Sequence, residues 1–195
     1  MEQEVDELTL IEGAVLGLLV QQPRHGFALA RQFVRDHSIG RVFNAQPPVV
    51  YRALRTLEQR GLTSSDAPRA STQGPSRTVK HPTAAGRAAF EAWLATPVGH
   101  MRDVRLELLV KLALHDELDR DPRPLLEAQL ALLRKVHVAA VDRPTPPTWF
   151  DQMLAVWRTE VGDATFRFLE RALAQEPSGT REGSGSRTTP AQQRS

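Results

Sequence analysis

A mainly α-helical fold is predicted for this 195-residue chain, and three observations support the prediction. Apolar residues recur at helical spacing over most of the sequence. Fourteen prolines divide these patterns into separate segments. One stretch, residues 62–80, instead alternates β-branched with polar residues around a turn-rich centre, as strands of a hairpin do. The resulting order is three helices, a hairpin and a helix, followed by three longer helices. We therefore predict a winged helix-turn-helix at the N-terminus and an α-helical domain behind it.

The first helix is predicted from apolar residues spaced at i, i+3, i+4, i+7 and i+8. These residues are Ile11, Ala14, Val15, Leu18 and Leu19. This spacing places all five side chains on one buried face. Pro23 ends the helix, because proline lacks the N–H that a helix interior needs. A second, short helix is indicated by Phe27, Ala30 and Phe33.

The third helix begins at Pro47-Pro48 and is expected to end at Gly61. One of its faces is apolar and consists of Val50, Ala53, Leu54 and Leu57. The opposite face carries Pro48, Tyr51, Arg52, Arg55 and Gln59. An α-helix fits the major groove of DNA, where arginine can donate two hydrogen bonds to guanine. The pattern predicts a recognition helix, although a solvated helix face with two arginines would look the same.

The hairpin is predicted to be the wing, with strands at 62–65 and 76–80 and a turn at Gly74-Pro75. Arg69, Arg77 and Lys80 flank the turn. Positive charge on a wing supplies affinity for the DNA backbone without reading sequence. A loop with scattered arginines is the alternative. After the hairpin, Thr83 is expected to cap a helix that carries Trp93.

The formal net charge of +2 is unevenly distributed along the chain. Residues 1–19 hold five acidic residues and no Lys or Arg. Residues 20–90 hold eleven Lys or Arg against three acidic residues, a net charge of +8. The basic segment coincides with the predicted helix-turn-helix and wing, and it is what a polyanion-binding module requires.

Several classes of protein are excluded by residues that the sequence lacks. It has no cysteine, which removes disulfides, thiolate metal sites and cysteine nucleophiles. The six histidines show no zinc-site spacing, and neither a phosphate-binding glycine loop nor a nucleophile elbow occurs. We therefore expect no enzyme activity, no cofactor and no metal. The acidic N-terminus is unlike a secretory signal, and the aliphatic run 14–20 is too short to span a bilayer, so we expect a cytoplasmic protein without a membrane partner.

The second half is predicted to contain helices at 104–118, 125–141 and 149–174. The first of these is apolar on more than one side, and the last carries a stripe of large apolar residues. One small winged domain offers too little surface to cover both, so we predict an obligate homodimer. The alternative is that these helices fold back on their own winged domain. The expected division is a DNA-binding domain at 1–98, a dimerisation domain at 99–175 and a disordered tail at 176–195.

Three segments resemble motifs of the PadR family of bacterial transcriptional regulators. Residues 22–30, Gln-Pro-Arg-His-Gly-Phe-Ala-Leu-Ala, are similar to that family's Pro-x-His-Gly-Tyr-x-Leu. Residues 50–62, which include Tyr-Arg-Ala-Leu and Leu-Glu-Gln-Arg-Gly-Leu, are similar to its Leu-Tyr-x-Ala-Leu-x-x-Leu-Glu-x-x-Gly-Leu helix. Residues 83–87, Thr-Ala-Ala-Gly-Arg, are similar to its Leu-Thr-x-x-Gly segment, with Pro82 where leucine is usual. The resemblance covers roughly 8–95, and it departs from the family at Pro47-Pro48 and at Val79-Lys80, where the family often has a tyrosine pair.

The resemblance implies a homodimeric repressor of transcription that binds a near-palindromic operator in double-stranded DNA. Together with the helix face and the wing, it indicates these DNA-binding residues: Arg24, His25, Gln46, Pro48, Tyr51, Arg52, Arg55, Arg77 and Lys80. Some family members bind phenolic or drug-like ligands near the dimer centre. For such a small aromatic or drug-like effector Trp93 is the candidate, with packing in the dimer as the favoured alternative. A helical protein–protein adaptor that never binds DNA is the alternative function.

Overall fold

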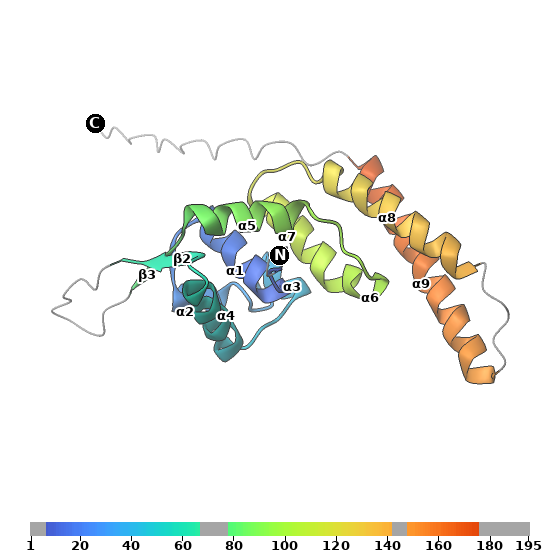
Figure 1. Cartoon of the computed structure of the whole chain (residues 1–195), viewed down its shortest axis with the longest axis horizontal. Helices are drawn as coiled ribbons and strands as arrows, with labels where there is room; N and C mark the ends of the chain where they lie inside the picture. The colour runs from blue at the N-terminus through green and yellow to red at the C-terminus, as the bar shows by residue number, and fades with distance from the viewer. Residues whose placement is uncertain (1–6, 67–77, 142–147, 176–195) are drawn as a thin grey trace, which may run out of the picture.

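A computed structural model of the chain describes residues 7–66, 78–141 and 148–175 (Figure 1). Within these ranges helices predominate, and a small sheet lies at one end of the molecule, far from the helix pair α8 and α9 (Figure 1). The mainly α-helical prediction is confirmed. The wing turn at Gly74-Pro75, the side chains of Arg69 and Arg77, and the tail at 176–195 lie outside the described residues.

Among the described residues, four helices precede the hairpin, one more than predicted. They are α1 (Leu10–Gln21), α2 (Gly26–Arg31), α3 (Ser38–Val42) and α4 (Pro47–Gln59). Thr9 caps α1 in a capping box, because Glu12 Oε2 accepts from the Thr9 N–H at 2.9 Å while the Thr9 hydroxyl accepts from the Glu12 N–H at 3.4 Å. The added helix, α3, has five residues, too few to produce a recognisable apolar period.

The sheet has three short antiparallel strands in the order β1-β3-β2. They are β1 (Arg24–His25), β2 (Thr63–Ser65) and β3 (Val79–Pro82). The predicted hairpin is therefore present, although β3 begins later than the predicted strand at 76–80. The short β1 was not predicted. It pairs with β3 so that Arg24 lies opposite Lys80, which brings the segment before α2 to the base of the wing.

The turn after α4 is joined directly to the start of α5 (Ala84–Ala95). Gly61 follows the helix with φ +68°, a conformation that glycine adopts without strain, as predicted for the end of this helix. The Thr83 hydroxyl accepts from the Gly86 N–H at 3.0 Å, which confirms the predicted cap, and donates to the Gly61 carbonyl at 2.8 Å. Thr83 therefore links the turn after α4 to the first turn of α5.

The second half forms α6 (Met101–Asp103), a π-helical turn η1 (Val104–Leu108), α7 (Leu109–Glu117), α8 (Arg123–Val141) and α9 (Trp149–Ala174). The single helix predicted at 104–118 is thus a π-helical turn continued by an α-helix. The bounds of α9 agree with the prediction, and α8 packs beside it (Figure 1). Among the described residues no helix is both long and apolar enough to cross a membrane.

Buried apolar residues form two separate clusters. The first joins α1, α2, α4 and α5, and it also contains Val110 and Leu114 of α7. The second joins Val104 and Leu108 to α8 and to Leu169 of α9. The winged domain therefore covers one side of α7 within the same chain. For this helix, the structure agrees with the alternative that the C-terminal helices fold back on their own winged domain. The proposed boundary at residue 98 stays a prediction, and α7 packs with residues on the N-terminal side of it.

Candidate nucleic-acid interface

The two faces predicted for α4 are present in the structure. Val50 and Leu57 are fully buried, and Ala53 and Leu54 are buried beside them. Pro48, Arg52, Arg55 and Gln59 are exposed. Tyr51 lies on the same side with 39% of its surface exposed. Because the buried stripe anchors α4 against α1 and α2, the opposite face is presented as a rigid surface.

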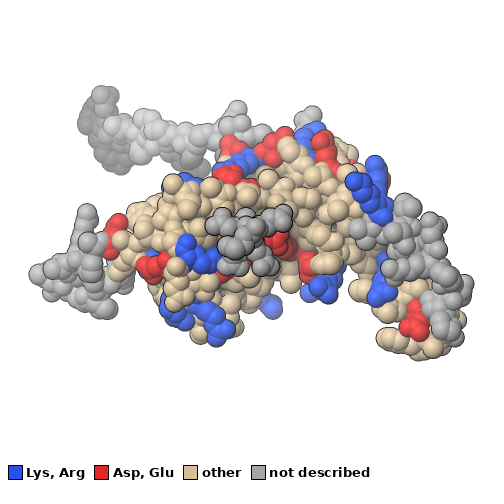
Figure 2. Space-filling model, in the orientation of Figure 1, with Lys and Arg blue, Asp and Glu red and all other residues tan. Residues whose placement is uncertain are grey.

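Basic side chains gather over α4 at the lower left of the view in Figure 2. Within the described ranges, neither Arg52 nor Arg55 forms an ion pair with an acidic residue. Their guanidinium groups are available to an external partner. A guanidinium can donate to phosphate or, in the major groove, to guanine with two parallel hydrogen bonds.

Gly26 allows α4 to approach the start of α2 closely. A Cβ at this position would lie 2.7 Å from Cε1 of Tyr51, so a larger residue would require the tyrosine ring to shift. The ring is thereby held next to the turn that carries Arg24 and His25. Both of these side chains are half-buried, and Arg24 donates from Nη2 to Gln21 Oε1 at 2.6 Å. The structure thus brings Arg24, His25 and Tyr51 to one place from separate segments.

Gln46 and Pro48 lie at the exposed beginning of α4. Gln46 is the N-cap residue, and its side chain makes no capping hydrogen bond. The next two residues are prolines, which have no N–H to offer. A helix usually presents free N–H groups to anions at this end. Here two of those donors are missing, so side chains must supply most of the contacts to a phosphate.

Lys80 lies at the root of the wing, where it contacts an acidic residue of α4. Its Nζ is 3.0 Å from each carboxylate oxygen of Glu58 and 2.6 Å from Oγ of Ser65. The Ser65 hydroxyl also donates to Glu58 at 2.7 Å. These two donors hold the pKa of the Glu58 carboxyl below its usual range. We call Glu58, Ser65 and Lys80 the wing-root cluster. Neither Glu58 nor Ser65 was predicted from the sequence as a site residue.

A second polar network ties the same end of the molecule to α7. Gln21 Nε2 donates to the Glu117 carboxylate at 2.5 Å, and the Ser38 hydroxyl donates to the other carboxylate oxygen. Gln21 in turn accepts from Arg24. The position of Arg24 is therefore linked through Gln21 to the last turn of α7. No sequence pattern indicated this network, because its members come from four separate segments.

Trp93 lies in the core of its own chain. Its side chain is 8% exposed and packs on Gly13 of α1, where an added Cβ would be 2.5 Å from the ring carbon Cδ2. Lys111 Nζ lies over the ring, 4.7 Å from its centroid, and is 2.8 Å from Glu107 Oε1. Burial lowers the pKa of Lys111. The tryptophan therefore helps to join α5 to α7, and its role in ligand binding stays a prediction.

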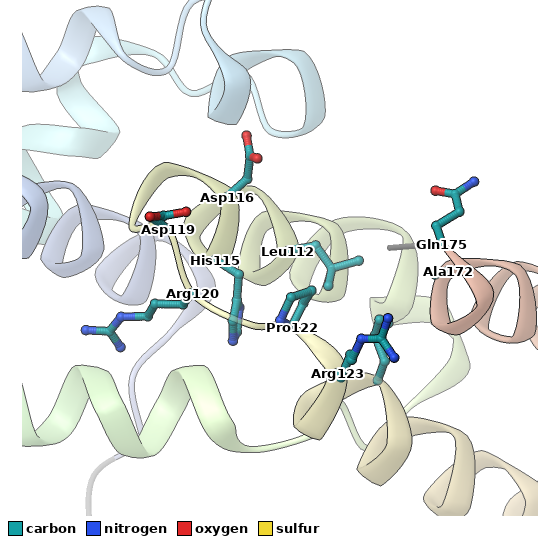
Figure 3. A pocket seen from close by; sticks show the side chains of 10 residues that line it. Leu112, His115, Asp116, Asp119, Arg120, Pro122, Arg123, Ala172 and Gln175 are labelled. Carbon is teal, nitrogen blue, oxygen red and sulfur yellow. The ribbon is translucent and has the colours of Figure 1, made fainter. Parts of the chain in front are cut away.

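A pocket of about 280 Å³ lies between the end of α7, the start of α8 and the end of α9 (Figure 3). It is lined by Leu112, His115, Asp116, Asp119, Arg120, Pro122, Arg123, Leu126, Ala172 and Gln175. His115 Nδ1 is 2.8 Å from the Lys111 carbonyl oxygen, and burial lowers the pKa of this imidazole. Trp93 is not among the lining residues. Within the described ranges no group of three His, Asp or Glu side chains is placed to hold a metal ion.

Comparison with known proteins gives one family match. Residues 15–92 match the family model described as the Transcriptional regulator PadR-like family. No curated protein matches the chain significantly.

Solved structures of low sequence identity are also similar to the chain. Bacillus subtilis PadR in complex with operator DNA is 18% identical, with a TM-score of 0.44 over 85% of this chain and 98% of that one. The protein smu.1604c from Streptococcus mutans UA159 is 18% identical, with a TM-score of 0.40 over 84% of this chain and 98% of that one. The PadR-like regulator BC1756 from Bacillus cereus is 21% identical, with a TM-score of 0.39 over 88% of this chain and 98% of that one.

Proposed function

We infer that this chain, whose residues 15–92 match the PadR-like family of transcriptional regulators, binds double-stranded DNA with α4 as the recognition helix. The observation that supports this most strongly is the pair of exposed arginines, Arg52 and Arg55, on a helix whose opposite face is fully packed. A rigid helix with guanidinium groups on its outer face is the element that enters a major groove. Tyr51, Gln46 and Pro48 would flank these contacts.

The wing and the segment before α2 are proposed to contact the DNA backbone. Arg24 and His25 form β1, at the base of the wing. Arg77 lies outside the described residues, and its predicted role rests on the sequence alone. Backbone contacts supply affinity and orientation without selecting a base sequence. The proposed division of labour is therefore base recognition by α4 and sequence-independent affinity from its surroundings.

We further propose that the protein acts as a homodimeric repressor on a near-palindromic operator. The outer face of α9 supports the dimer, because it exposes Trp149 by 73% and Trp157 by 57%, with Phe150, Met153 and Val156 beside them. A contiguous apolar patch of this kind is typical of an interface. Two recognition helices must lie about 34–36 Å apart to reach successive major grooves, which a dimer can arrange.

Release of the repressor by a small aromatic or drug-like effector is part of the same proposal. The pocket in Figure 3 has a volume of about 280 Å³, close to the lower end of the usual range for small-molecule sites. Asp116 lines it and is adjacent in sequence to Glu117, which holds Gln21 and hence Arg24. A molecule in the pocket would therefore contact the turn of α7 that is connected to the DNA-facing surface.

Duplex binding that weakens steeply with salt is the expected result that tests this function. Neutralising several phosphates releases counter-ions, so affinity should fall by about 10³-fold or more between about 50 and 200 mM salt. Fluorescence anisotropy on the promoter of the protein's own gene, and on a random duplex of equal length, measures this. Affinity that does not respond to salt, or no binding to either duplex, would favour the helical adaptor instead.

Arg55→Ala is expected to weaken binding to the operator by about 1–3 kcal/mol and to relax its specificity. The reason is that Arg55 projects from the exposed face of α4, where a guanidinium can bind a guanine edge. The ratio of operator to random-duplex affinity is the quantity to compare. Arg102→Ala is the matched control, since Arg102 is an exposed arginine of α6. Equal losses on both duplexes would show that Arg55 contacts only phosphate.

A further inference from the structure

The wing-root cluster connects the recognition helix to both strands of the wing. Glu58 comes from α4, Ser65 from β2 and Lys80 from β3. Three distances of 3.0, 3.0 and 2.6 Å join Lys80 Nζ to the two Glu58 oxygens and to Ser65 Oγ. An ammonium group has three donors, which is enough to serve these three contacts. The cluster is therefore a closed set of contacts rather than a single surface ion pair.

The charge of Lys80 is already compensated inside the protein. Its side chain is only 20% exposed, and the carboxylate that it contacts belongs to the helix proposed to enter the groove. A lysine that binds phosphate as its main role would be expected to extend freely into solvent. To reach a phosphate, Lys80 would first have to leave Glu58 and Ser65. The sequence predicts that Lys80 binds the DNA backbone. That interaction would have to compete with the contacts that Lys80 makes to Glu58 and Ser65.

We propose that Glu58 is a positioning residue that determines specificity, because it holds Lys80 away from phosphate and keeps the wing in register with α4. This inference rests on the proposed DNA-binding function. Lys80 lies opposite Arg24 in the β1–β3 pairing, so its position also bears on the segment before α2. Glu58 thereby fixes the position of α4, which is proposed to select bases, relative to the wing and β1, which are proposed to bind the DNA backbone. A protein with this device keeps non-specific affinity low.

The slope of log affinity against log salt concentration tests the proposal. Each phosphate contact makes this slope steeper by slightly less than one, so the slope reports the number of contacts. The probe is a mixed-sequence duplex of about 30 base pairs, used with the full-length protein. Lys80→Met should leave the slope unchanged, since Lys80 makes no phosphate contact. Glu58→Gln frees Lys80, and the slope should steepen by about one while affinity for this probe rises. The double variant should return to the wild-type slope.

The ratio of operator to mixed-duplex affinity is a second readout. A variant that only loses packing would not lower this ratio while raising affinity for the mixed duplex. In Glu58→Gln the ratio of operator to mixed-duplex affinity should fall, whereas Lys80→Arg, which can still pair with Glu58, should retain it. Arg102→Met is the control for the precision of the slope. Circular dichroism melts confirm that each variant is folded, as expected for partly exposed side chains.

Two results would overturn the proposal. A slope that falls by about one in Lys80→Met would show that Lys80 binds phosphate in the complex. An unchanged slope in Glu58→Gln would show that Glu58 does not restrain it. Either result leaves the DNA-binding function intact, since the wild-type protein would still bind in a salt-dependent way. If the wild-type protein binds no duplex at all, the function and the proposal both fail.

Discussion

Replacing Gly86 by alanine is expected to lower the free energy of unfolding by about 3 kcal/mol or more. A Cβ at this position would overlap the carbonyl oxygen of Leu62. That oxygen cannot move away at low cost, because it accepts from the Thr83 N–H at 3.0 Å, and Thr83 caps α5. In an unobstructed helix, glycine to alanine would instead stabilise by about 1 kcal/mol. The sign of the change thus tests whether α5 really lies this close to the turn after α4.

Urea denaturation followed by circular dichroism measures the effect of Gly86→Ala. Gly99→Ala is the control, because Gly99 is exposed and a Cβ there would meet no atom within 4 Å. We expect that control to change the free energy of unfolding by less than about 0.5 kcal/mol. A Gly86→Ala variant as stable as the wild type would contradict the close packing of α5 against the turn after α4.

Replacing both Trp149 and Trp157 by glutamate is expected to convert the proposed dimer to monomers and to reduce duplex affinity by about 10²-fold or more. Both tryptophans lie on the apolar outer face of α9, eight residues apart. A buried tryptophan at an interface is commonly worth 2 kcal/mol or more, and a carboxylate in its place adds a desolvation cost. A monomer can engage only one half-site, so most of the affinity for a palindrome is lost.

Light scattering at micromolar concentration gives the mass of each variant, and anisotropy gives its affinity. Arg158→Glu is the matched control, because it adds a carboxylate to α9 at an exposed position away from the apolar face. A wild-type protein that is monomeric at this concentration and still binds its operator tightly would refute the dimer. Point variants suit the test better than truncation at residue 98, which would remove Val110 and Leu114 from the first buried cluster.

The helices with a clear apolar period were predictable, because helical spacing is a local property of the chain. The buried stripe Val50, Ala53, Leu54 and Leu57 required no knowledge of what α4 packs against. The same holds for the Thr83 cap and for Gly61, since a cap and a left-handed turn involve only neighbouring residues. These features place Arg52 and Arg55 on an exposed face, and they account for the part of the candidate site that lies on α4.

The short elements could not be predicted in this way. The strand β1 has two residues and exists because β3 supplies its hydrogen-bonding partner. The helix α3 buries Ile39 and Gly40, a pattern too brief to have a period. For 104–118 the sequence indicated only that the segment is apolar on several sides. Its tertiary contacts decide that Leu108 packs with α8 and α9 while Leu114 packs with the winged domain.

The amino-acid sequence by itself determined which helices form, where the basic residues concentrate and which face of α4 is exposed, because each depends on spacing along one segment. Only the tertiary structure decided the partners of the polar side chains. Glu58 and Lys80 are 22 residues apart in the sequence, and they meet because β2 and β3 pair in one register. Trp93 enters the core because Gly13 leaves space for it. Contacts of this kind depend on how segments pack, and no periodicity within a segment encodes that.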